Sequence, residues 1–186
     1  MSLALLLGDR HQGKTATCRR LAERLRARGL SVGGIIAPAL FEAGRCVGYA
    51  VADLATGQSA RLAIIDGPGV ERVGCFHLQS EGLALGRAAL RQAVEWPHCL
   101  VIVDEVGPLE LAGGGWSEQL DSLTVRKGLT LFTVRRPLAT QVAERWGASP
   151  GSWYDLAVGA DGVIDAVFKR VGGSDGPANG CDMPVS

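Results

Sequence analysis

An eight-residue segment with two glycines constrains the fold of this chain more than any other part of the sequence. The segment GDRHQGKT spans residues 8–15 and directly follows the apolar run Leu3–Leu7. After it, apolar residues recur at helical spacing from Lys14 to Arg28, and Gly29 ends the pattern. A buried strand, a glycine-containing turn and an amphipathic helix thus follow one another. Units of this kind build α/β domains with parallel sheets.

The residue types in this turn are those that bind phosphate. Glycine allows successive backbone N–H groups to point inward, and the following helix adds the positive end of its dipole. Lys14 supplies a slim ammonium group, although only three of the nineteen basic residues are lysines. Thr15 supplies a hydroxyl for Mg²⁺. The pattern is the phosphate-binding loop, or Walker A motif. We expect the whole loop to bind a nucleotide: Gly8, Asp9, Arg10, His11, Gln12, Gly13, Lys14 and Thr15.

A second apolar run, Cys99–Val103, ends in two carboxylates, Asp104 and Glu105. Alone, such an acidic pair is typical of a helix cap or a loop charge. Together with the phosphate-binding loop it indicates a Walker B strand, in which Asp104 holds the water shell of Mg²⁺. A glutamate at the next position can polarise an attacking water as a general base, so Glu105 and Lys14 are candidate catalytic residues.

A third group of polar residues lies at the end of the apolar run Leu129–Val134. Ligands of open parallel sheets bind beyond the carboxyl ends of the strands, which is where Thr133, Arg135 and Arg136 fall. An arginine there could neutralise charge that develops on a transferred phosphoryl group. The alternative is an arginine pair that caps the strand end in solvent. The sequence leaves both interpretations open.

The remaining pattern predicts an α/β fold: a mostly parallel central sheet flanked by helices, with an inserted antiparallel β-meander. The meander is assigned to Val32–Ala37, Val47–Leu54 and Ala60–Ile65, and helices to Leu83–Glu95, Trp116–Val125 and Leu138–Trp146. For Trp153–Val171 we expect a strand near Leu156 or Val163 and a short closing helix. Residues 1–171 would form one domain, and the small and polar residues 172–186 a disordered tail.

The composition excludes several classes of protein. The 186 residues carry zero formal net charge, so no nucleic-acid partner is expected. The longest apolar run is far shorter than the roughly 20 residues of a membrane span, and no signal peptide is apparent. The five cysteines are scattered without a C-x-x-C pattern, which favours free thiols in the cytoplasm. A protein partner is possible but cannot be identified from the sequence.

Several stretches together resemble one family, the small cytoplasmic P-loop nucleoside-triphosphatases that include the cancer-related nucleoside-triphosphatase. They are the loop GDRHQGKT, the block GGIIAPALFEAGRCVGYAVADLATG, the short RVG and the strand end VDEVGPLEL, within residues 3 to 147. The sequence departs from the family at His11, where many such loops carry glycine, and after Gly147. The resemblance implies a second stretch that contacts the nucleotide: Val101, Ile102, Val103, Asp104, Glu105, Val106, Gly107 and Pro108.

The resemblance also implies Mg²⁺-dependent hydrolysis of nucleoside triphosphates, such as ATP or GTP, to the diphosphate and phosphate with broad base specificity. Two alternatives stay open. The first is a nucleotide-binding accessory protein for cofactor assembly, of the molybdopterin type, because RLRARGLSVGGI is similar to the opening pattern of such adaptors. The second is a small-molecule or nucleotide kinase, although Arg135 and Arg136 are the only lid-like arginines. Glu105 favours turnover over passive binding.

Overall fold

A ten-stranded sheet runs through residues 2–172, the part of the chain that this computed structural model describes. The strands are β1 (Ser2–Leu7), β2 (Val32–Ile36), β3 (Ala39–Glu42), β4 (Arg45–Asp53), β5 (Ser59–Ile64), β6 (Glu71–Val73), β7 (Phe76–Leu78), β8 (Leu100–Val106), β9 (Leu129–Val134) and β10 (Trp153–Asp155). The helices are α1 (Lys14–Arg26), α2 (Ser80–Glu95), α3 (Pro108–Leu111), α4 (Ser117–Leu123), α5 (Ala139–Trp146) and α6 (Ala160–Gly172). Short 3-10 turns cover Arg136–Leu138, Pro150–Ser152 and Leu156–Val158.

The sheet has a parallel half and an antiparallel half. Its strand order is β10-β1-β9-β8-β2-β4-β5-β7-β6, and β3 pairs with β4 beside this path. The five strands from β10 to β2 are parallel, whereas every pairing from β2–β4 onward is antiparallel. Because the parallel strands point the same way, the loops that follow β1, β8 and β9 meet at one edge of the sheet.

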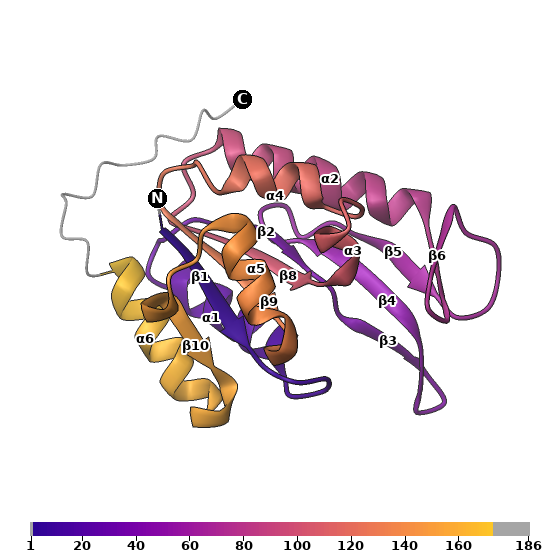
Figure 1. Cartoon of the computed structure of the whole chain (residues 1–186), viewed down its shortest axis with the longest axis horizontal. Helices are drawn as coiled ribbons and strands as arrows, with labels where there is room; N and C mark the ends of the chain where they lie inside the picture. Colours follow the sequence, from indigo (N-terminus) through magenta and orange to yellow (C-terminus); the bar gives the residue numbers. More distant parts are fainter. Residues whose placement is uncertain (1, 173–186) are drawn as a thin grey trace.

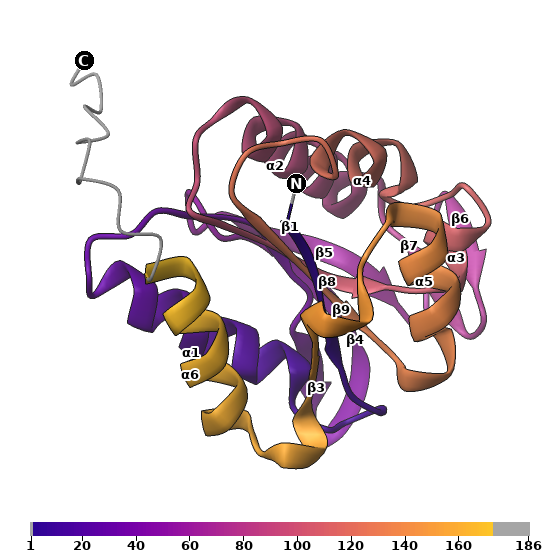
Figure 2. The same ribbon diagram turned by 60° about the vertical axis from the view of Figure 1, so that its left-hand side comes forward.

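Helices cover both faces of the sheet (Figure 1). Helices α2, α4 and α5 pack on one face, and α1 and α6 lie side by side on the other, as Figure 2 shows from a second direction. The side chains of β1 alternate between the two cores: Leu3, Leu5 and Leu7 point to the first, Ala4 and Leu6 to the second. A strand buried on both faces needs apolar residues at every position, which explains the continuous run at the start of the chain.

The structure confirms the predicted α/β fold with its mostly parallel central sheet and antiparallel meander. Strands β2, β4 and β5 pair in chain order, as expected, and the meander continues into the unpredicted hairpin β6–β7. Strand β3 was not predicted either. Strand β8 continues beyond its expected end at Val103, through Asp104 and Glu105 to Val106.

The prediction for the end of the chain was partly wrong. The last strand is Trp153–Asp155, just before Leu156, and Val163 lies in a helix instead of a strand. The closing helix α6 has 13 residues and is not short. Its buried residues Val163, Ile164 and Val167 have helical spacing, and α6 packs on α1. The predicted tail falls on residues that, apart from Gly172 in α6, lie outside the described part. No helix within residues 2–172 is both long and apolar enough to span a membrane.

Gly34 provides a test of the parallel pairing between β2 and β8. It lies opposite Ile102 with a φ of 94°, and a Cβ there would be 2.0 Å from the carbonyl oxygen of Ile102. Gly34→Ala should therefore lower the free energy of unfolding by about 4 kcal/mol, through backbone strain together with the clash. Urea unfolding measures this loss.

The matched control is Gly29→Ala, where φ is also positive at 74° but no atom lies within 4 Å of the added Cβ. That variant should lose only about 1–2 kcal/mol. Equal losses in the two variants would contradict the close approach of β2 and β8.

Candidate active site

The loop after β1 is ordered by short-range hydrogen bonds. The Gly8 N–H donates to the carbonyl of Val134 at 3.2 Å, which ties the loop to the end of β9. The Asp9 N–H donates to Gln12 Oε1 at 2.7 Å, and the Gln12 N–H donates to the Asp9 carbonyl at 3.3 Å. His11 adopts a φ of 62°. Glycine takes this left-handed conformation more easily than histidine, so the backbone keeps the shape typical of a glycine at this position.

Lys14 occupies the inside of the loop. Its side chain is 6% exposed, and Nζ donates to the carbonyls of Gly8 at 2.9 Å and Asp9 at 3.0 Å. Gly13, just before it, has a φ of 87° and caps α1 without a side chain, so the first N–H groups of the helix are open toward the loop. The loop thus presents a buried ammonium group and free backbone donors on the same side, a combination that suits an anion.

Asp104 joins the start of α1 to the ends of two strands. Its Oδ2 accepts hydrogen bonds from Thr15 Oγ1 at 2.6 Å and from the Ala37 N–H at 3.2 Å, while Oδ1 accepts from Thr133 Oγ1 at 2.6 Å. Burial raises the pKa of Asp104, and these three hydrogen bonds oppose the rise. Residues 15 and 104, which sequence reasoning assigned to one metal site, are therefore in direct contact although 89 positions apart.

Glu105 lies between two cations. Its Oε1 accepts a hydrogen bond from Arg135 Nε at 2.8 Å, and its Oε2 is 3.6 Å from Lys14 Nζ. The carboxylate side chain is 30% exposed, so solvent reaches it. Glu105 therefore contacts both the loop and the end of β9.

Arg136, which the sequence did not distinguish from Arg135, has a different environment. Its guanidinium binds Asp155 through Nε at 3.1 Å and Nη2 at 2.5 Å, donates to Gln12 Oε1 at 3.0 Å, and forms an ion pair with Asp9. Hydrogen bonding to Asp155 raises the pKa of Arg136. Arg136 thus clamps the loop to the end of β10. Asp155 was not predicted for the site, although a strand was expected near Leu156.

The apolar members of the predicted second stretch lie inside the sheet. Val101, Val103 and Val106 belong to the core under α2, Ile102 belongs to the core under α1, and all four are 0% exposed. Their side chains pack in the two hydrophobic cores and do not face the loop. They anchor the strand that carries Asp104 and Glu105. Gly107 and Pro108 begin the turn into α3.

Sequence reasoning missed one buried carboxylate near the site, Glu110 in α3. Its Oε2 accepts from the Gly107 N–H at 2.9 Å, and it receives further hydrogen bonds from its own N–H and from that of Trp116. Burial raises the pKa of Glu110 to about 7. A signal was present: proline at the first position and glutamate at the third are typical of a helix start, where such a glutamate can accept a hydrogen bond from the N-cap N–H.

Glu110 should make stability depend on pH. Its pKa of about 7 in the folded protein exceeds the ordinary value of 4.5, so the folded state holds an extra proton between these values and stability falls as pH rises through this range. Glu110→Gln removes this titration. Wild type should therefore lose about 3 kcal/mol of unfolding free energy relative to the variant between pH 4 and pH 8. Urea unfolding across this range measures the change, and a pH-independent difference would contradict it.

Comparisons with known proteins give the family. A profile of the NTPase family matches residues 4–160. The nucleoside-triphosphatase THEP1 of Methanothermobacter thermautotrophicus is 32% identical over 143 residues, which are 76% of this chain and 80% of that protein. The protein of the same name from Methanopyrus kandleri is 32% identical over 148 residues, 75% of this chain and 79% of its own length.

Two solved structures share the fold. The solution structure of a human cancer-related nucleoside triphosphatase has a TM-score of 0.74 at 20% identity and covers 95% of this chain and 100% of its own. The crystal structure of THEP1 from Aquifex aeolicus has a TM-score of 0.69 at 18% identity and covers 91% of this chain and 98% of its own. These comparisons confirm the resemblance noted in the loop and strand-end motifs. The chain belongs to the NTPase family.

Proposed function

We propose that this chain hydrolyses nucleoside triphosphates to the diphosphate and phosphate at the loop of residues 8–15, with Glu105 as the general base. The observation that carries the proposal is the position of Glu105, whose carboxylate lies 3.6 Å from the ammonium group of Lys14. A base next to the phosphate-binding lysine is within reach of a water molecule that attacks the terminal phosphate. Relatives known as nucleoside-triphosphatases support the same activity.

The loop geometry supports phosphate binding. The carbonyls of Gly8 and Asp9 now accept hydrogen bonds from Lys14. Phosphate oxygens carry full negative charge and form stronger, charge-assisted bonds. A bound triphosphate would draw the ammonium group toward its β- and γ-phosphates, while the first N–H groups of α1 would bind further phosphate oxygens.

Thr15 and Asp104 fit a magnesium ion. Both offer oxygen donors, and Thr15 Oγ1 and Asp104 Oδ2 lie 2.6 Å apart at the start of α1. Mg²⁺ binds through few protein oxygens and completes its shell with water and substrate phosphates, and the described residues contain no cluster of three or more acidic, cysteine or histidine side chains that would hold an ion alone. When bound, the ion would neutralise charge on the β- and γ-phosphates.

The hydrolytic step uses the residues around Glu105. The Glu105 carboxylate takes a proton from water as the water oxygen bonds to the γ-phosphorus, and the bond from that phosphorus to the bridging oxygen breaks, leaving the diphosphate. Arg135 holds Glu105 at 2.8 Å and can neutralise charge on the transferred group. Arg136, bound to Asp155 and Asp9, positions the loop instead of touching the reacting atoms.

Neither alternative from the sequence gains support from an observation of the site. Within residues 2–172, no structural feature favours an accessory protein for cofactor assembly or a kinase over a hydrolase. Broad base specificity and a cytoplasmic location stay predictions.

Glu105→Gln tests the proposal. The amide keeps the size of the side chain but is not a base, so kcat should fall by roughly 10²–10⁴-fold, or about 3–5 kcal/mol of barrier. Triphosphate affinity should be retained or rise, because a negative charge near the γ-phosphate is removed. Single-turnover hydrolysis and equilibrium binding of both proteins measure the two effects.

The control is Glu118→Gln, the same change at an exposed glutamate of α4, which should leave turnover as in the wild type. A Glu105→Gln protein that hydrolyses as fast as the wild type would contradict the general-base role. A wild-type protein that binds triphosphate tightly without turnover would favour the accessory-protein alternative.

A further inference from the structure

The end of β10 lies beside the start of the phosphate-binding loop. In the parallel pairing of β1 with β10, Asp155 is opposite Leu7, the last residue before the loop. Leu156, which follows Asp155, is buried, and its Cδ1 would be only 3.1 Å from a Cβ at Gly8. Two consecutive residues at this strand end are therefore placed against the first residues of the loop, one by strand pairing and one by packing.

Asp155 fixes the direction of the Arg136 guanidinium. Its Oδ2 accepts a hydrogen bond from Nε at 3.1 Å, and its Oδ1 accepts one from Nη2 at 2.5 Å, so the pair is bidentate. Oδ1 also accepts from the Ala157 N–H at 2.8 Å, which holds the carboxylate in place. Because a guanidinium is planar and rigid, these bonds also determine where its third nitrogen, Nη1, points.

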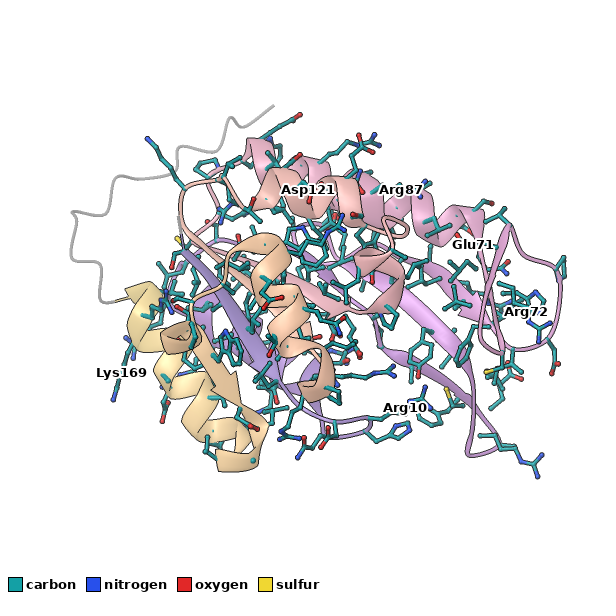
Figure 3. All side chains as sticks on the ribbon, viewed as in Figure 1. Arg10, Glu71, Arg72, Arg87, Asp121 and Lys169 are labelled. Atoms are coloured by element: carbon teal, nitrogen blue, oxygen red, sulfur yellow. The ribbon has the colours of Figure 1, made fainter. Side chains whose placement is uncertain are left out.

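Nη1 of Arg136 binds the loop at two points. It forms an ion pair with Asp9 and donates a hydrogen bond to Gln12 Oε1 at 3.0 Å. The same Oε1 accepts from the Asp9 N–H at 2.7 Å, so both loop residues are joined to one nitrogen. Within residues 2–172, no other cation forms an ion pair with Asp9. Figure 3 shows Arg10, the next loop residue, on the side of the loop away from β10. Arg136 is thus the polar link between β10 and the loop.

We propose that Asp155 is a positioning residue for the phosphate-binding loop and acts through Arg136. This rests on the proposed function, since it concerns nucleotide phosphates bound by residues 8–15. Asp155 holds the guanidinium, and the guanidinium holds Asp9 and Gln12, so the loop is ordered before a nucleotide arrives. An ordered loop loses less conformational freedom on binding, which raises its affinity for phosphates.

The direction of one effect separates this role from a simple charge effect. Asp155→Asn removes a negative charge near an anion site, so Coulomb's law alone predicts a higher affinity for triphosphate. Positioning predicts a loss of about fivefold, because the amide can still accept from the Ala157 N–H but no longer forms the bidentate ion pair with Arg136. Diphosphate affinity should fall by the same factor, since the loop positions phosphates that both ligands share. Calorimetric titration with the diphosphate and a non-hydrolysable triphosphate analogue measures both.

Arg136→Gln tests the route through the guanidinium. This variant should lose about 10-fold in affinity for both ligands. Adding Asp155→Asn to it should cause no further loss, because the contact is already broken. Additive losses would overturn the proposal. A loss for the triphosphate alone would also overturn it, since Arg136 would then act on the γ-phosphate directly.

A second pair of aspartate and arginine supplies a matched control. Asp165 of α6 forms an exposed ion pair with Arg24 of α1, and neither residue belongs to the loop. Asp165→Asn should leave both affinities within about twofold of wild type. Unchanged or higher affinity in Asp155→Asn, or an equal loss in Asp165→Asn, would overturn the role of Asp155. The titrations require no turnover, so a wild-type protein that binds nucleotide without hydrolysis would contradict the proposed function while binding still decides the role of Asp155.

Discussion

The buried carboxylate of Asp104 is the interaction on which the site depends. A carboxylate removed from water costs several kcal/mol unless other groups hydrogen-bond to it. Here Thr15, Thr133 and the Ala37 N–H supply those bonds from the start of α1, the end of β9 and the segment after β2. The raised pKa of Asp104 shows that burial still outweighs them. Asp104 thus joins three elements through hydrogen bonds. It also keeps a carboxylate group next to the loop.

The two halves of the sheet have different roles around this point. The parallel half brings the ends of β1, β8 and β9 together, which places Lys14, Glu105 and Arg135 in contact. The antiparallel half extends the same sheet past β2. We infer that the parallel strands build the phosphate site.

The sequence predicted what depends on neighbours along the chain. The loop, the strand before it and the pair Asp104 and Glu105 have local signatures, because spacing and residue type determine their conformation. The clamp between Arg136 and Asp155, by contrast, joins residues 19 positions apart across two loops. Spacing along the chain does not reveal such a contact.

The helix around Val163 also lay outside the reach of sequence patterns. A strand was expected near Leu156 or Val163; it lies just before Leu156, whereas Val163 lies in α6. A short apolar run fits a strand or a helix equally well, and packing against α1 made it helical.

We propose that the Lys14 ammonium group, on nucleotide binding, exchanges the carbonyls of Gly8 and Asp9 for phosphate oxygens. Calorimetric titration of Lys14→Met with a non-hydrolysable triphosphate analogue tests it most directly, because methionine fills the buried volume without the charge. We expect affinity to fall by about 100-fold or more, the loss of charge-assisted bonds to phosphate, with the unfolding midpoint close to wild type. Equal affinity in the two proteins would contradict phosphate binding at this loop.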